Sequence, residues 1–341
     1  MSPLLDQAAT LRSGLEIFLS GERGCPVTVS GLKRLTGGTS HETWAFDLHE
    51  NNQSDVMPLV LRRDFSADVL DLELGTEFSL LQALYDDGIP VPRPLYCVQT
   101  ESPIETPFMI SERLDGKDIR KEMAANPERA VSLGERLTDI QASVHAIDWK
   151  LLIAKTNLKL PENPAAYQVD LWTKTLTDNL IEPEPMLSYA ASWLECHLPH
   201  DVPLAMIHGD FKANNLLFDS NGRIAVIDWE LAHVGDPYED LAFTLLWTTR
   251  FDIVGGMLSR EAYLHCYEKT TGQKVDPERL FYWQVFAWVK LAAIFLKGFC
   301  EDEANQSARP ARIMLVRAIP WISVQLGKLF AEHHEGQGVK I

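Results

Sequence analysis

Two aspartates and an asparagine stand at a spacing that could handle a metal-bound phosphate. Asp210 lies in the segment IHGDFKANNL, Asn215 follows it by five positions, and Asp228 lies in the segment IDWE. Phosphoryl transfer needs a carboxylate that orients the attacking hydroxyl group and accepts its proton, and oxygen ligands for a Mg²⁺ ion that bridges the phosphates. Because Mg²⁺ prefers hard oxygens and keeps several waters, one carboxylate and one amide suffice beside the oxygens of a nucleotide. The three side chains therefore suit magnesium-dependent phosphoryl transfer.

A predicted β-hairpin explains how Asn215 and Asp228 could face the same ion. Two apolar runs, at residues 216–219 and 223–227, are separated by Ser-Asn-Gly. Asn-Gly between apolar runs is a strong hairpin signal. Asn215 directly precedes the first run and Asp228 directly follows the second, so antiparallel pairing would place them at neighbouring strand ends.

These motifs resemble those of a known enzyme family. HGDFKANN followed by VIDWE is similar to the catalytic and metal-binding motifs of the aminoglycoside phosphotransferase and choline kinase group. GDPYEDLA, at residues 235–242, is similar to the GDPxxDLA segment of the same family, and the resemblance covers roughly residues 30–300. It implies a protein-kinase-like α+β fold with two lobes, in which Asp210 is the catalytic base and Asn215 and Asp228 hold Mg²⁺.

Three further polar residues near these motifs are assigned supporting roles. His208 is interpreted as structural, bracing the loop through hydrogen bonds, with direct catalysis as the alternative. Asp240 is expected to anchor the same loop and not to bind the metal. Glu230 fits two roles equally well, because it could approach a second metal ion or the substrate, or be an ordinary solvated or salt-bridged glutamate.

A glycine-rich segment, LTGGTSHE at residues 35–42, is expected between two strands, where the family has its phosphate-covering loop. The backbone N–H groups at Gly37 and Gly38 could approach a phosphate, and the hydroxyl groups of Thr39 and Ser40 could add donors. A simple hairpin connection is the alternative. The sequence contains no GxxxxGK[ST] motif, so it has no Walker-type phosphate loop.

Arg62 stands in a predicted strand, where the fold usually has a lysine that grips the nucleotide phosphates. An arginine still supplies a fixed positive charge and a two-pronged donor for phosphate. Its expected partner is Glu77 in the following helix, with Glu73 as the second choice. An ordinary surface ion pair at a strand end is the alternative.

The segment FMISERL, at residues 108–114, resembles the strand that leads into the hinge between the two lobes. Backbone groups near Ser111 and Arg113 would then bond the edge of the purine, while Met109 or Leu217 could pack against its ring. The resemblance therefore adds Ser111 and Arg113 to the predicted nucleotide-binding residues.

An aromatic-rich stretch lies further along the chain, at residues 281–295. Its helical spacing is more typical of core packing than of a ligand pocket. Trp247, Phe251 and Tyr282 are kept as candidates for the substrate pocket.

The pattern of apolar residues predicts a small sheet-rich lobe followed by a larger helical lobe. Strands are expected at 27–35, 42–48, 58–63, 95–99 and 108–114, with helices at 4–19 and 72–85. Helical spacing then recurs at 127–146, 163–180, 186–197, 237–249, 260–271, 277–299 and 308–330. We therefore predict a nucleotide-binding N-terminal lobe with an antiparallel sheet at residues 1–114, and a mainly helical C-terminal lobe at 115–341 that carries the catalytic loop and the substrate site.

Composition restricts the partners and the compartment. The formal net charge of −17 argues against nucleic-acid binding, which requires a basic face. It mildly favours a cationic acceptor, although an ordinary solvated acidic surface is the preferred interpretation. Five scattered cysteines without a CxxC pair indicate reduced thiols. The N-terminus lacks the pattern of a signal peptide, and no apolar stretch is expected to reach the ~18 residues of a membrane span. We therefore expect a cytoplasmic protein that binds no membrane.

The sequence therefore predicts a kinase that uses Mg²⁺ and either ATP or GTP to phosphorylate a hydroxyl group of a small metabolite or antibiotic. A non-catalytic nucleotide-binding module is the alternative, because Arg62 replaces the usual lysine. A protein kinase is disfavoured, because the chain runs from Asp228 to GDPYEDLA without a long activation segment. The acceptor, the choice between ATP and GTP, and the oligomeric state are left open by these patterns.

Overall fold

A computed structural model describes residues 3–35, 42–50, 56–63, 72–100, 102–114, 116–219, 221–304 and 316–336. The chain forms two compact units that interleave along the sequence. The first unit comprises Met1–Pro127, Lys150–Leu158 and Ala213–Ala232, and the second comprises Glu128–Trp149, Lys159–Lys212 and His233–Ile341. Compared with the predicted lobe boundary after Leu114, the first unit additionally includes the segment that carries Asn215 and Asp228.

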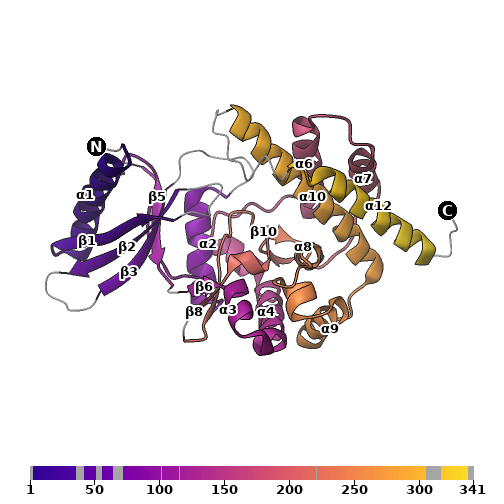
Figure 1. The fold of residues 1–341 in the computed structure, drawn as a ribbon, viewed down its shortest axis with the longest axis horizontal. Coiled ribbons are helices and arrows are strands. Elements are labelled where there is room, and N and C mark those ends of the chain that lie inside the picture. Colours follow the sequence, from indigo (N-terminus) through magenta and orange to yellow (C-terminus); the bar gives the residue numbers. More distant parts are fainter. Residues whose placement is uncertain are drawn as a thin grey trace. The chain divides into compact units, whose positions relative to one another are not determined.

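The first unit is built on a five-stranded antiparallel sheet with the strand order β1-β2-β3-β5-β4 (Figure 1). Its strands are β1 Val27–Arg34, β2 Glu42–Glu50, β3 Val56–Arg63, β4 Pro94–Val98 and β5 Phe108–Glu112. Helix α1, Pro3–Arg23, packs its apolar side chains Leu11, Leu15 and Leu19 into the same core as Phe46 and Phe108. The strands and the first helix predicted from apolar spacing are thus confirmed to within a few residues at each end.

A second, three-stranded sheet belongs to the first unit. It has the order β6-β8-β9, with β6 Gly116–Asp118, β8 Leu216–Asp219 and β9 Ile224–Val226. Strands β8 and β9 pair antiparallel, which confirms the predicted hairpin. Strand β6 was not predicted. The helical segments α2 Leu74–Asp86, α3 Ile119–Ala125 and η2 Ala213–Asn215 complete this part, and α5, Trp149–Lys155, falls almost entirely within it.

The second unit is mainly helical. Its helices are α4 Ala130–His145, α6 Pro164–Asn179, α7 Pro185–Cys196, α8 Tyr238–Leu246, α9 Arg260–Thr271, α10 Pro277–Ala304 and α12 Ile319–Gly336, with the turn η3 Ile253–Met257. The predicted helices are confirmed except for the last one, which was predicted at 308–330. Helix α12 begins only at Ile319, after a turn at residues 317 and 318, and residues 308–315 lie outside the described residues. Two short strands that were not predicted, β7 Ala205–Ile207 and β10 His233–Gly235, pair antiparallel. Together the two units have the predicted α+β character.

Helix α10 is the central element of the second unit, since it packs against α6, α7, α8 and α12 (Figure 1). By length and composition alone it could cross a membrane, which corrects the expectation that no apolar stretch is long enough. Of its most apolar window, however, 78% is buried inside the protein. Its apolar side chains therefore serve contacts with neighbouring helices, as in the core helix of a globular unit.

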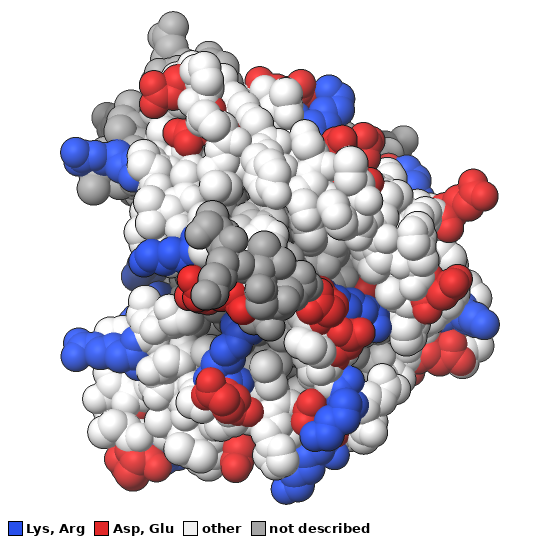
Figure 2. Space-filling view, turned by 90° about the vertical axis from the view of Figure 1, so that its right-hand side faces the viewer, with Lys and Arg blue, Asp and Glu red and all other residues white. Residues whose placement is uncertain are grey.

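Charged side chains are dispersed on the face of the molecule in Figure 2. Asp and Glu are interspersed with Lys and Arg, and the described residues of that face form no continuous basic patch. The net charge of −17 is thus not gathered into one acidic region on this face.

Candidate active site

The predicted site residues are divided between the two units. Arg62, Glu77, Asn215 and Asp228 belong to the first unit, and Asp210 belongs to the second. The phosphate-loop residues Gly37, Gly38, Thr39 and Ser40 lie outside the described residues, so their role stays a prediction.

Arg62 is the centre of an ion cluster in the first unit. Its Nη1 atom lies 2.6 Å from Glu77 Oε1, and its Nη2 atom lies 3.8 Å from Glu230 Oε2. Burial alone would lower the pKa of Arg62, but the negative charges of Glu77, Glu230 and Asp228 outweigh burial and raise it. The predicted pairing with Glu77 is confirmed, and Glu73, the second choice, is exposed just before α2. A fixed cation is thus held on β3 by carboxylates.

Glu230 has a defined place in this cluster. Its side chain pairs with Arg62, and its backbone carbonyl accepts a hydrogen bond of 2.8 Å from Leu72 N. Of the two roles left open by the sequence, the structure therefore shows the salt bridge.

The hairpin brings the two predicted metal ligands to neighbouring strand ends. Ile227 N donates a 2.9 Å hydrogen bond to the carbonyl of Asn215, next to the paired residues Leu216 and Val226. Asn215 is buried, whereas Asp228 is exposed. This arrangement confirms the adjacency that the hairpin predicted, although metal binding itself stays a prediction.

The backbone at Asp228 is strained, because its φ angle is +72°. Residues other than glycine seldom adopt this left-handed conformation, and such strain concentrates at functional sites. The donor set also fits Mg²⁺, since a carboxylate and an amide oxygen are hard ligands of the kind this ion takes together with water. Within the described part of the chain no cluster of three His, Cys, Asp or Glu side chains suggests another type of metal site.

The predicted hinge residues lie at the end of β5. Arg113 N donates to the carbonyl of Pro58 over 2.9 Å, and Glu112 N donates to the carbonyl of Arg93 over the same distance. The Arg113 side chain pairs with Asp47 at 2.8 Å. Because the amides of Glu112 and Arg113 are engaged within the unit, a purine that bonds the backbone of either residue would have to use its carbonyl group.

The loop that carries Asp210 in the second unit is held by a single carboxylate. His208 N donates to Asp240 Oδ2 and Gly209 N donates to Asp240 Oδ1, both over 2.8 Å. Asp210 N in turn donates to His208 Nδ1 over 3.1 Å. The interpretations of His208 as a brace and of Asp240 as an anchor are thereby confirmed. Gly209 has a φ angle of +83°, which explains the need for glycine at this turn.

Asp240 is fully buried and remains ionised because of its donors. Burial would raise its pKa, but the hydrogen bond and charge of His145, together with His208, lower the pKa to about 2. His145 Nε2 lies 3.2 Å from Asp240 Oδ2, and His145 Nδ1 lies 2.8 Å from the hydroxyl group of Tyr267. His145 is therefore a packed histidine at the end of α4 that supports the anchor.

Lys212 and Trp247 lie beside Asp210. Lys212 Nζ lies 2.7 Å from Asp210 Oδ2 and 5.4 Å from the centre of the Trp247 ring. The indole Nε1 of Trp247 is buried without a hydrogen-bond partner among the described residues. This observation supports Trp247 as a pocket candidate, whereas Tyr282 is buried and donates to the carbonyl of Leu194.

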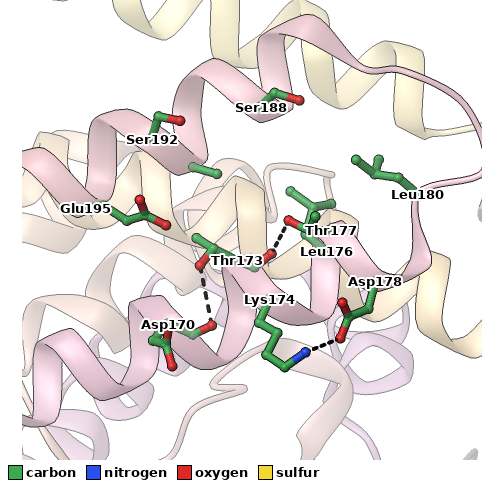
Figure 3. Close-up of a pocket in the computed structure, with 11 residues that line it drawn as sticks. Asp170, Thr173, Lys174, Leu176, Thr177, Asp178, Leu180, Ser188, Ser192 and Glu195 are labelled. Atoms are coloured by element: carbon green, nitrogen blue, oxygen red, sulfur yellow. Dashed lines mark hydrogen bonds and ion pairs between the residues drawn. The ribbon is translucent and has the colours of Figure 1, made fainter.

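A groove of about 450 Å³ lies between α6 and α7, away from the predicted site residues of the second unit. Figure 3 shows Thr173 and Thr177 of α6 opposite Ser188 and Ser192 of α7. None of the predicted catalytic, metal-binding or nucleotide-binding residues lines this groove, and both threonine hydroxyl groups donate to carbonyl groups of their own helix. The groove therefore adds nothing to the candidate active site.

Sequence reasoning missed a set of side chains on α10 that support the loop. Arg279 and Trp283 both donate to Asp236, and Lys290 donates to Glu239 and to the carbonyl of Gly209. The only signal available in the sequence is the presence of a lysine in the middle of an otherwise apolar helix.

The comparisons with known proteins agree with this architecture. A Ralstonia eutropha structure assigned as an aminoglycoside phosphotransferase superposes with a TM-score of 0.76 at 21% identity, over 94% of this chain and 98% of that one. Choline kinase LicA from Streptococcus pneumoniae superposes with a TM-score of 0.61 at 15% identity, over 92% and 99% of the two chains. These likenesses identify the two-lobed fold of the kinase-like phosphotransferases.

The family follows from the sequence match. Residues 31–280 match the model of the phosphotransferase enzyme family, so the chain belongs to that family. It is 32% identical to human acyl-CoA dehydrogenase family member 11 over 70% of this chain and 31% of that protein. It is 29% identical to mouse acyl-CoA dehydrogenase family member 10 over 72% of this chain and 23% of that protein. The chain thus spans about a quarter to a third of the length of these curated relatives.

Replacing the anchor should destabilise the second unit in a pH-dependent way. We expect Asp240→Asn to lower the free energy of unfolding by about 3–5 kcal/mol at pH 7, because an amide nitrogen would face a backbone N–H group. The pKa of Asp240 is about 2 in the folded protein against 3.8 in an unfolded chain, so the unfolded state takes up the proton first as the pH falls.

The advantage of the wild type over Asp240→Asn is therefore expected to be complete above about pH 4 and to shrink as the pH falls toward about 2. Urea denaturation of both proteins across this range measures it. A difference that is independent of pH would contradict the assignment of an ionised anchor.

Proposed function

We propose that this protein transfers the γ-phosphoryl group of Mg²⁺-bound ATP or GTP to a hydroxyl group of a small molecule. The observation that carries the proposal is the hairpin end at which Asn215 and Asp228 lie together, in the same unit as the Arg62 cluster. Membership of the phosphotransferase enzyme family supports a kinase-like enzyme. The nucleotide, the metal and the acceptor are the parts that this proposal adds.

Each residue has a distinct task in the proposed reaction. Asp210 accepts a hydrogen bond from the acceptor hydroxyl group and takes its proton as the oxygen attacks the γ-phosphorus atom and the bond to the leaving oxygen breaks. Asn215 and Asp228 would hold Mg²⁺, which supplies positive charge to the phosphate oxygens when bound. Arg62 directs its guanidinium group at the α- and β-phosphates, and the amides of Gly37 and Gly38 cover them.

The names of similar proteins suggest which acceptors to test first. The chain is 26% identical to the viomycin phosphotransferase of Streptomyces vinaceus over 46% of its length, and other relatives are named for aminoglycosides, choline and acyl-CoA dehydrogenases. An aminoglycoside, an amino alcohol and a hydroxyacyl compound are therefore the first acceptors to test, and homoserine is added as a further small hydroxyl compound. A cytoplasmic location is also proposed. The five cysteines all lie among the described residues, and none of them forms a disulfide.

The test is a panel of these hydroxyl compounds with ATP and GTP, read through coupled release of ADP or GDP. We expect at least one acceptor to raise nucleotide turnover above basal hydrolysis in the presence of Mg²⁺. Tight nucleotide binding with neither hydrolysis nor acceptor turnover would instead identify a non-catalytic nucleotide-binding module, the reading suggested by Arg62 in place of lysine.

Substitutions of Asp210 and Asp228 should distinguish the residue that acts on the acceptor from the residue that binds the metal. We expect Asp210→Ala to reduce turnover by at least about a thousandfold while nucleotide affinity stays within about threefold of the wild type, because this carboxylate acts on the acceptor. Asp228→Ala should lose both activity and Mg²⁺-dependent nucleotide binding. Steady-state kinetics and nucleotide titration with and without Mg²⁺ measure both. Lost nucleotide affinity with retained turnover in Asp210→Ala would reverse the roles.

The pair formed by Arg62 and Glu77 can be tested with a control from the same helix region. We expect Glu77→Gln to weaken MgATP binding by about tenfold, because a charge-assisted contact that orients the guanidinium group is lost. Glu73→Gln alters an exposed carboxylate one helical turn earlier and should change affinity by less than about twofold. Isothermal titration of both variants decides the point, and equal effects would refute a specific role for Glu77.

A further inference from the structure

Lys290 is a buried cation at the centre of the second unit. It lies in the middle of α10 with a side chain that is 1% exposed. Its Nζ atom donates to the carbonyl of Gly209 over 2.7 Å and to Glu239 Oε1 over 2.9 Å. The rings of Trp172, Phe243 and Phe286 surround it, with centres 5.2, 5.3 and 6.0 Å from Nζ. The ammonium group of Lys290 is thus enclosed by aromatic rings and hydrogen-bonded to the loop of Asp210.

Packing alone does not account for a lysine at this position. Taking an ammonium group out of water is costly, and an apolar side chain of similar length would fill the same space without that cost. The cost is offset by the faces of three rings and by Glu239. Burial would raise the pKa of Glu239, but Lys290 and His233 outweigh burial and lower it, so this partner is ionised.

An apolar side chain at position 290 could not donate the hydrogen bond that the carbonyl of Gly209 accepts from Lys290. Gly209 N donates to Asp240 Oδ1, while its carbonyl accepts from Lys290 Nζ. That carbonyl belongs to the peptide group whose nitrogen is Asp210 N, which donates to His208 Nδ1. The peptide group directly before Asp210 is therefore fixed on both of its polar sides.

We propose that Lys290 is a positioning residue that fixes the orientation of the Gly209–Asp210 peptide group and, through it, the direction of the Asp210 side chain. The inference rests on the proposed function for its effect on turnover, but the clamping of the loop stands on contacts within the second unit alone. Lys290 itself touches neither nucleotide nor acceptor in this account. Its part is to prevent rotation of a peptide group that follows a glycine.

The first test compares Lys290→Met with Lys269→Met, an exposed lysine on α9 that serves as the control. In Lys290→Met, we expect the peptides that cover residues 205–212 to exchange their amide hydrogens at least about tenfold faster, because the carbonyl of Gly209 loses its donor. Basal hydrolysis of MgATP should fall by about 10–100-fold, with the KM for MgATP changed by less than about threefold. Lys269→Met should match the wild type in all three measurements.

The double variant Lys290→Met/Glu239→Gln separates positioning from stability. It removes both buried charges, so we expect its melting temperature to exceed that of Lys290→Met, which leaves Glu239 without its lysine. If Lys290 positions the loop, exchange in residues 205–212 stays fast and kcat stays low despite the recovered stability. Recovery of kcat and slow exchange together with stability would overturn the proposal, because the lysine would then serve only to neutralise Glu239.

Failure of this inference can be told apart from failure of the proposed function. Absence of nucleotide turnover in the wild type refutes the function, and the exchange comparison still decides the inference. Unchanged exchange in folded Lys290→Met, or fast exchange with undiminished kcat, overturns the inference even where the wild type is an active kinase. Should Lys290→Met fail to fold, the same readouts are taken on the double variant.

Discussion

The interaction on which the second unit depends is the contact between the Asp240 carboxylate and two consecutive backbone amides, those of His208 and Gly209. A buried N–H group without an acceptor is costly, and a loop in the interior cannot satisfy its amides through a sheet or a helix. One ionised side chain at the start of α8 solves this problem for two residues at once. It thereby ties the residues before Asp210 to α8, a helix that is buried along its whole length.

The motif GDPYEDLA is best understood as a set of buried anions that require partners. Each of its three carboxylates is buried, and a buried charge persists only when it is paired and hydrogen-bonded. The partners come from different elements: Arg279 and Trp283 for Asp236, Lys290 and His233 for Glu239, and His145 for Asp240. The segment therefore joins α4 and α10 to the loop of Asp210, and it need not touch a ligand to matter for function.

Local patterns predicted most of the fold and part of the site. The Asn-Gly hairpin and the strands of the first sheet depend on residues close in sequence. The pairing of Arg62 with Glu77 joins a strand to a helix over 15 positions, and it was expected from the family resemblance and not from local spacing. The contact of Lys290 with Gly209 joins residues that are 81 positions apart. The spacing of apolar residues along the chain predicts helices and strands, but it does not predict contacts between residues so far apart. The strands β6, β7 and β10 were missed for a related reason, since three residues are too few to show alternation.

The charge balance of the Arg62 cluster bears on the form in which a nucleotide could bind. Glu77, Glu230 and Asp228 all act on one guanidinium group, so this part of the first unit carries an excess of negative charge. A bare triphosphate would be repelled by that excess, whereas a divalent cation reduces it. We therefore expect metal and nucleotide to bind together, with the cation at Asn215 and Asp228 and the phosphates toward Arg62. Because a guanidinium group presents several donors, Arg62 pairs with two carboxylates at once, and it suits this acidic environment at least as well as lysine would.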